Sequence, residues 1–186
     1  MARPRTDARR RVLDAAERLL TERGYHGFSY QHVADVLQVK APAIHYHFRR
    51  KPDLVVAVLG RYRLGFARFA DAQADSTPAD RLTAYVALSR TLVVDGRVGA
   101  LAACAATLAA LPADVAEAVL ALLADIEAFL VTVVGTPARA RAVTSAVLGA
   151  QLMGRARGVE AYDTAVAELL APDRFAGSGV LLALRA

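Results

Sequence analysis

The sequence predicts an all-α protein. Of its 186 residues, 55% are apolar, so the chain can bury a sizeable core and wholesale disorder is excluded. Alanine and leucine dominate, and the β-branched residues never form the alternating runs that a sheet requires. Apolar residues instead recur at helical spacing between prolines and glycines.

The first helix is expected from Thr6, its capping residue, to Arg23, with Gly24 as the stop. Ser29 caps a short second helix, YQHVADVL. After the tight connection at Gln38 and Val39, a third short helix covers residues 40–47. Pro42 is tolerated there because the first turn of a helix has unpaired N–H groups anyway.

Pro52 marks the start of a long fourth helix of about 22 residues, which we expect to join an N-terminal head to the rest of the chain. The remaining helices are expected at Pro78–Asp95, Val98–Leu111, Pro112–Val134, Pro137–Arg157 and Ala161–Leu170, with a tail after Pro172. The predicted domains are residues 1–50, an N-terminal head of three helices, and residues 51–186, a helical body.

Charge is distributed unevenly along the chain. Residues 1–63 hold 13 Lys/Arg and 6 Asp/Glu, a net charge of +7, whereas residues 64–186 hold 10 and 12, a net charge of −2. All four histidines also lie in the first part. This asymmetry indicates a head that binds a polyanion, although a scattered, solvated basic face gives the same totals.

Two observations concern the cell compartment. The longest charge-free stretches, Val98–Pro112 and Ala142–Gly154, are shorter than the roughly 20 residues of a membrane span and are expected to be buried helices. The N-terminus lacks the apolar region of a secretory signal, and the single cysteine excludes an internal disulfide. We therefore expect a protein of the reducing cytoplasm.

Two short helices after a longer one, framed by arginines, fit a helix-turn-helix. The second short helix would enter the major groove of DNA. The apolar residues Val39, Ile44 and Phe48 would pack it against the other helices of the head. The groove-facing side would then carry Lys40, Pro42, Ala43, His45, Tyr46 and His47.

The His45-x-His47 pair has other possible uses. Residues i and i+2 of a helix point about 200° apart, so these imidazoles cannot chelate one metal ion, and no metal is predicted. General-base catalysis requires a partner and a pocket that a short exposed helix does not offer. For His47 a purely structural role remains an alternative, whereas His45 is best interpreted as a DNA contact.

Residues 8–59 resemble the N-terminal domain of TetR-type transcriptional repressors. The resemblance consists of AAERLLTERGY at the end of the first helix, VADVLQV at the turn, IHYHF in the third helix, and then Lys51 and Leu54. The rest of the chain agrees with the family only in helical content and length.

The resemblance implies contacts to bases or phosphates in double-stranded DNA. The implied residues are Arg5, Tyr30, Gln31, Lys40, Ala41, Pro42, Ala43, His45, Tyr46, His47 and Lys51. Lys51 matches a lysine that commonly holds a phosphate, and Arg3, Arg9 and Arg10 would extend the contact as a basic arm. Two positions depart from the family: Gln38 replaces the usual glycine of the turn, and His45 replaces the commoner tyrosine.

Such repressors bind palindromic operators as homodimers, because one head offers only one recognition helix. The small residues of the Pro137–Arg157 helix are candidates for the dimer interface, or else for intramolecular core. They are Ala142, Ala146, Gly149, Ala150, Met153 and Gly154.

The family also implies a cavity for a small-molecule effector in the body. Candidate lining residues are Tyr62, Phe66, Phe69, Tyr85, Leu88, Arg90, Leu92, Cys104, Leu108, Phe129 and Met153, with Asp95 as a further polar group. Each is also an ordinary core residue. Cys104 is either a sensor of oxidants and electrophiles or a buried, inert thiol.

The predicted function is a homodimeric repressor, not an enzyme, that an unknown effector releases from its operator; no cofactor is implied. Two alternatives are a ligand-independent DNA-binding protein and a small helical enzyme with an anionic substrate. The enzyme alternative is disfavoured, because the chain has neither a histidine after His47 nor a Gly-rich phosphate loop.

Overall fold

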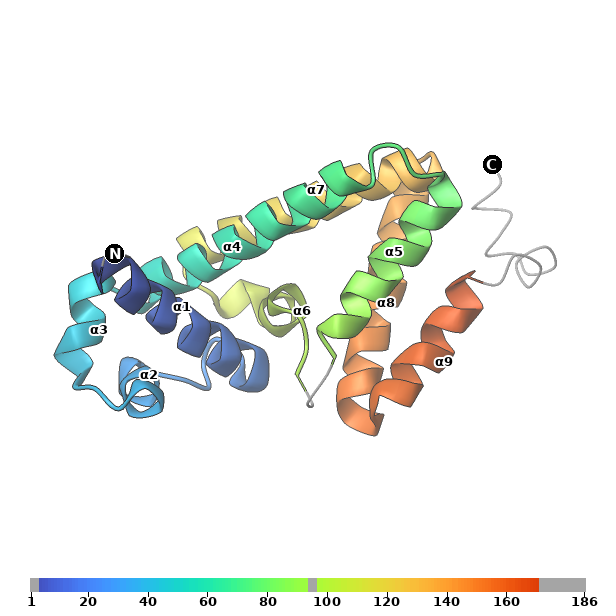
Figure 1. Ribbon diagram of the computed structural model, residues 1–186. Helices are drawn as coiled ribbons and strands as arrows, with labels where there is room; N and C mark the ends of the chain where they lie inside the picture. The colour runs from blue at the N-terminus through green and yellow to red at the C-terminus, as the bar shows by residue number, and fades with distance from the viewer. Residues whose placement is uncertain (1–3, 94–96, 171–186) are drawn as a thin grey trace. The chain divides into compact units, whose positions relative to one another are not determined.

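The computed structural model describes residues 4–93 and 97–170, and this part of the chain is helical without any strand (Figure 1). The α-helices are α1 (Pro4–Arg23), α2 (Tyr30–Leu37), α3 (Ala41–His47), α4 (Lys51–Ala72), α5 (Pro78–Thr91), α6 (Ala100–Ala105), α7 (Ala113–Val134), α8 (Pro137–Arg157) and α9 (Val159–Leu170), with a short 3-10 helix, η2 (Leu108–Ala110), after α6. The predicted all-α fold is confirmed. The predicted tail after Pro172 and Asp95 lie outside the described residues.

The chain divides into two compact units. The first comprises residues 1–65 and 100–122, and the second comprises residues 66–99 and 123–186. Helices α4 and α7 each begin in the first unit and end in the second. The predicted functional boundary near residue 50 remains a prediction.

In the first unit, α1, α2 and α3 pack around one apolar core. Helix α1 contributes Val12, Ala16 and Leu20, each at most 3% exposed, at the i, i+4, i+8 spacing of a single helix face. Val33 of α2 and Ile44 of α3 are fully buried against them. The core therefore leaves the opposite face of α3 exposed.

Local capping fixes the ends of α2. The Ser29 hydroxyl accepts from the His32 N–H, and His32 Nδ1 accepts from the Ser29 N–H at 3.2 Å, which completes a capping box. At the other end, Gln38 adopts the left-handed conformation with φ 54° and ψ 43°. The turn thus keeps the backbone geometry that usually selects glycine, and the glutamine bears the strain.

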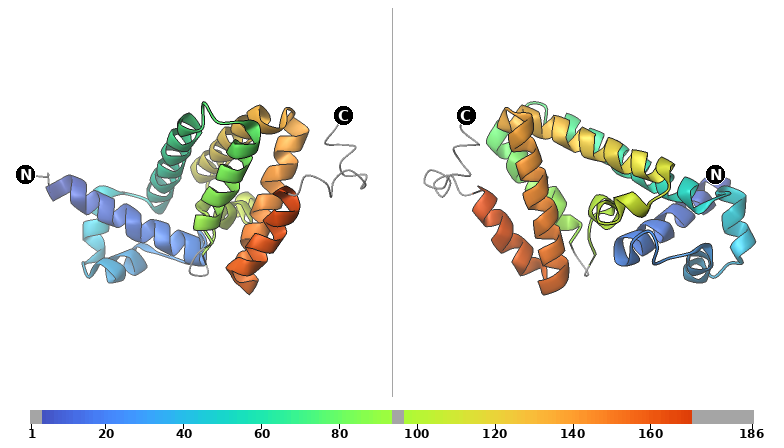
Figure 2. Two further views of the ribbon diagram at one scale, coloured as in Figure 1. Left: turned by 45° about the vertical axis from the view of Figure 1, so that its right-hand side comes forward. Right: turned by 180° about the vertical axis from the view of Figure 1, so that it is seen from behind.

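In the second unit, α8 and α9 pack side by side with α5 next to them (Figure 2). The hydroxyl of the fully buried Tyr162 in α9 donates to the Val86 carbonyl of α5 at 2.7 Å. A Cβ added to Gly154 of α8 would lie 2.4 Å from Val93 Cγ1 and 3.0 Å from Tyr162 Cβ. The absence of a side chain at Gly154 is therefore what allows α8 to approach these residues.

The helix predicted at Val98–Leu111 is wrong as a single element. The chain forms α6, then a turn at residues 106–107, and then η2. Both the N–H and the hydroxyl of Thr107 donate to the Cys104 carbonyl, at 3.1 and 3.4 Å. This i−3 pairing replaces the i−4 bond that would continue an α-helix.

Within the described ranges, no single helix is both long enough and apolar enough to cross a membrane; α7 and α8 meet that test only when taken together, as a bent pair.

Candidate nucleic-acid interface

One face of α3 is buried in the core, and the residues on its other face are exposed. Ile44 is fully buried and Phe48, the C-cap, is 6% exposed. Pro42, Ala43 and His45 are exposed, and Tyr46 is 67% exposed. Lys40, the N-cap, is exposed as well. The structure therefore brings the predicted base-contacting residues of α3 together on one accessible surface.

His45 is held in one orientation at the edge of this surface. Its ring meets the Tyr30 ring edge-on at 4.6 Å, and its Nδ1 lies 3.3 Å from the Arg49 carbonyl oxygen. Since a carbonyl oxygen only accepts, this contact requires the proton on Nδ1. Nε2 is then the nitrogen left to meet a DNA group.

The buried side chain of Tyr30 contacts the C-terminal end of α3. It is 9% exposed, and its hydroxyl donates to the Phe48 carbonyl at 3.0 Å. Burial raises the pKa of its phenol to about 12, so the hydroxyl remains a donor. The Tyr30 side chain therefore positions the end of α3, and the predicted phosphate contact at the start of α2 remains a prediction. Gln31, next to it, is exposed and donates to Asp35 at 2.6 Å.

Lys51 is enclosed by the segment between α1 and α2. Its ammonium donates to the carbonyl oxygens of Tyr25 and Phe28, the latter at 2.6 Å. The same ammonium lies 4.4 Å from the Tyr25 ring centroid and 4.5 Å from that of Phe28. Burial lowers the pKa of this amine from its ordinary value. Two of its three N–H groups are used in this way, so Lys51 positions the start of α4, and its contact with a phosphate remains a prediction.

Arg50 links the start of α4 to α7. Its guanidinium lies 2.6 Å from a carboxylate oxygen of Asp53 and 3.1 Å from one of Asp114. The hydrogen bond from Arg50 lowers the pKa of the Asp53 carboxyl. The Arg50 backbone N–H also donates to Asp53, at 3.1 Å. These contacts were not anticipated from the sequence, because Asp114 is 64 residues away and no local pattern marks the pair.

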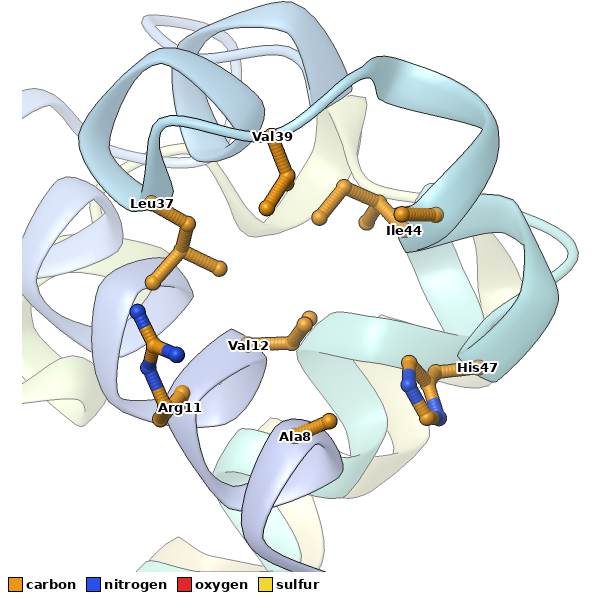
Figure 3. Close-up of a pocket in the computed structure, with 8 residues that line it drawn as sticks. Ala8, Arg11, Val12, Leu37, Val39, Ile44 and His47 are labelled. Carbon is orange, nitrogen blue, oxygen red and sulfur yellow. The ribbon is translucent and has the colours of Figure 1, made fainter. Parts of the chain in front are cut away.

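A small, partly open pocket lies between α1, α3 and the turn that precedes α3. Its volume is about 70 Å³, and Figure 3 shows Val12, Leu37, Val39 and Ile44 directed into it. Ala8, Arg11, Ala43 and His47 complete the lining. His47 is half-buried and belongs to this boundary, so its side chain combines packing with partial exposure.

The basic arm is described only in part. Arg3 lies outside the described residues, and Arg5 falls within α1. The Arg9 guanidinium lies over the Phe48 ring at 4.9 Å, and Arg10 pairs with Asp7 at 2.8 Å. Both arginines are exposed on α1.

Comparison with known proteins agrees with this geometry. Residues 12–58 match the family described as bacterial regulatory proteins, tetR family. The crystal structure of a TetR-family transcriptional regulator from Agrobacterium tumefaciens is 26% identical, covers 89% of this chain and 96% of its own, and has a TM-score of 0.82. The chain matches the TetR family of transcriptional regulators in residues 12–58 and shares the fold of a solved member of that family.

Two further relatives show the range of the similarity. A TetR transcriptional regulator from Legionella pneumophila shares the fold, with 23% identity over 91% of this chain and 96% of its own and a TM-score of 0.78. The HTH-type transcriptional activator FasR of Mycolicibacterium smegmatis is 37% identical over 59 residues. That match covers 32% of this chain and only 27% of the length of FasR.

The second unit of the chain brings together four of the predicted effector-site residues, as an aromatic cluster. Ring centroids of Phe66 and Phe129 lie 5.6 Å apart, and those of Phe69 and Phe129 also 5.6 Å apart. Tyr85 joins them at 6.4 Å from Phe66. Phe66, Tyr85 and Phe129 are buried, so the rings pack on one another as one aromatic cluster within the unit.

The other predicted effector-site residues are placed differently. Tyr62, Cys104 and Leu108 belong to the first unit, whereas Leu88 and Leu92 are half-buried in the second. Met153 is 46% exposed on α8. Arg90 is exposed and donates to both carboxylate oxygens of Asp163, at 2.6 and 2.8 Å, so its guanidinium is already paired within the unit.

The small-residue stripe of α8 is divided between two faces. Ala142, Ala146, Gly149 and Met153 are exposed, and a Cβ added to Gly149 meets nothing within 4 Å. Ala150 and Gly154 are buried within the unit. The intramolecular alternative therefore holds for Ala150 and Gly154, and only the other four residues are accessible to a partner.

Proposed function

We propose that this TetR-type regulator binds a palindromic operator sequence-specifically as a homodimer, and that it is a repressor released by a small-molecule effector. The observation that supports DNA binding most directly is the outward face of α3, with Lys40 and His45 exposed while Ile44 holds the opposite face. A recognition helix presented in this way suits the major groove.

The exposed stripe of α8 supports the dimer. Ala142, Ala146, Gly149 and Met153 follow at spacings of four, three and four residues, which places them on one helix face. Leu152, also 46% exposed, lies beside them. Small side chains let two helices approach closely, so a second copy of α8 is the partner that fits this face.

The substitution Ala146→Glu tests this interface, because it would place two carboxylates there. We expect the variant to sediment as a monomer, and a dimer of unchanged affinity would exclude this face.

The aromatic cluster of the second unit supports an apolar or aromatic effector. Phe66, Phe69, Tyr85 and Phe129 offer ring surfaces on which such a compound can pack. An effector acts only through its different affinities for the two states of the regulator, so it must bind the DNA-free form more tightly.

The test begins with the selection of bound duplexes from a random pool, followed by titration of the selected duplex against random duplex. We expect a palindrome with half-sites about 34–36 Å apart and a preference of at least 10³-fold at physiological salt. A ligand-independent DNA-binding protein would show little preference. A reporter gene behind the selected operator then distinguishes repression from activation, which matters because FasR is an activator.

Lys40→Ala and His45→Ala are the matching variants. Both positions are exposed, so these changes leave the fold intact, and we expect each to weaken binding to the selected duplex. Arg68→Ala, at an exposed position of α4 in the second unit, is the control and should bind normally.

A further inference from the structure

The first turn of α3 is chemically unusual for a DNA-reading surface. Its two exposed side chains are those of Pro42 and Ala43, and neither contains a hydrogen-bonding group. Pro42 also lacks an N–H, and the N–H of Ala43 already donates to the Lys40 carbonyl at 2.9 Å. At these two positions the helix therefore offers DNA only apolar surface.

Base edges in the major groove present mostly donors and acceptors. The C5 methyl group of thymine is the one apolar group among the four bases there. A polar base edge placed against Pro42 and Ala43 would lose water without gaining a hydrogen bond, which is unfavourable. A methyl group in the same place would bury apolar area favourably.

We propose that the first turn of α3 reads thymine through its methyl group, with Pro42 and Ala43 as the specificity-determining residues. The proposal rests on the proposed function, because it requires α3 to enter the major groove. It extends that function by naming thymine as the base that the first turn of α3 selects.

A neighbouring residue extends the apolar surface. Tyr46, one helical turn after Pro42, is 67% exposed and adds its ring to this surface. The hydrogen-bonding side chains Lys40 and His45 flank this strip. No Asn, Gln or Arg occurs between residues 39 and 48, so Lys40 at the N-cap is the one side chain there of the kinds that commonly make bidentate contacts with adenine or guanine.

The experiment uses the full-length protein and the duplex selected from the random pool. Each thymine of a half-site is replaced in turn by deoxyuridine, which removes the methyl group and keeps base pairing. We expect a 3- to 10-fold loss of affinity at one or two positions, as expected for one buried methyl group, and little change at the others. As a matched control, a C·G pair at a sensitive position should bind weakly, and 5-methylcytosine there should recover part of the affinity.

The protein variant Ala43→Gly removes the facing methyl group. It should lower affinity for the thymine operator and reduce the penalty of deoxyuridine at the sensitive position. A second variant, Ala43→Ser, keeps the size and adds a hydroxyl, and should weaken the preference for thymine over cytosine.

The outcomes separate the two hypotheses. If no duplex is selected over random DNA, the proposed function fails, and this inference fails with it. If a specific operator is selected but it tolerates deoxyuridine at every position, or contains no thymine in its half-sites, the proposed function stands and thymine reading is overturned.

Discussion

The ammonium of Lys51 donates to the Phe28 carbonyl oxygen at 2.6 Å while lying 4.5 Å from the ring centroid of the same residue. This relationship ties the first turn of α4 to the segment that precedes α2. Tyr25 holds the same ammonium in the same two ways. This one side chain therefore contributes to holding the start of α4 against the segment that precedes α2.

The first prediction compares Lys51→Met with Lys40→Ala. Lys51→Met leaves two carbonyl groups without their donor, so we expect a loss of about 1–3 kcal/mol in the free energy of unfolding. Lys40→Ala should leave stability unchanged and reduce the slope of log affinity against log salt concentration by about one, if Lys40 contacts a phosphate. Urea unfolding and salt-dependent titration measure the two quantities. A Lys51→Met protein of unchanged stability would contradict the positioning role.

The second prediction concerns the turn between α2 and α3. Gln38 has φ 54°, where a side chain costs about 1 kcal/mol and glycine does not. Gln38→Gly should therefore raise the free energy of unfolding by roughly 0.5–1 kcal/mol. Gln38→Ala, which keeps a Cβ, should leave it nearly unchanged. Thermal melts of the three proteins test this, and a lower melting temperature for the glycine variant would show that the Gln38 side chain contributes more than its backbone strain costs.

Much of the fold could be predicted from the sequence, because local signals set most helix ends. Ser29 and Thr136 accept backbone N–H groups as caps, and Pro78 and Pro137 begin helices as their fixed φ angles allow. The break after α6 could not be predicted, since no glycine or proline marks it. It depends on Thr107 bonding back to Cys104 within an alanine-rich run that otherwise favours a helix.

The candidate interface could be predicted only in part from the sequence. The outward face of α3 follows from helical periodicity, because Ile44 had to be buried. The roles of Lys51 and Tyr30 did not follow, since a lysine at a helix start and a tyrosine at a helix N-terminus suit a phosphate as well as they suit buried carbonyl groups. The structure shows the contacts with the carbonyl groups of Phe28 and Phe48, and the phosphate contacts of the two residues remain predictions.

The third prediction uses two glycines of α8 as a matched pair. A Cβ on Gly154 would lie 2.4 Å from Val93 Cγ1, so Gly154→Ala forces a shift and should destabilise the protein by about 1–3 kcal/mol. A Cβ on Gly149 meets nothing within 4 Å, so Gly149→Ala should instead gain up to about 1 kcal/mol of helix propensity. Urea unfolding at equal protein concentration compares them. Equal effects of the two changes would contradict the packing at Gly154.

The last prediction concerns Cys104, the one cysteine of the chain. Its side chain is fully buried, and burial raises the pKa of its thiol from 9.0 to about 11. Only the thiolate reacts with electrophiles, so native protein at pH 7.5 should resist alkylation while urea-unfolded protein reacts. Intact-mass measurement follows the reaction, with Cys104→Ser as the control that cannot be modified.

The same shift in pKa predicts how stability depends on pH. The folded protein holds the thiol proton more tightly than the unfolded chain does. This contribution to stability is therefore complete below about pH 9 and is lost as the pH rises through about 11. The hydroxyl of Tyr85, with a pKa raised to about 12, adds a similar loss at higher pH. Cys104→Ala should flatten the decline in the free energy of unfolding between pH 9 and 11.

Rapid alkylation of the native protein at neutral pH would show that the Cys104 thiol is accessible and would favour the sensor hypothesis.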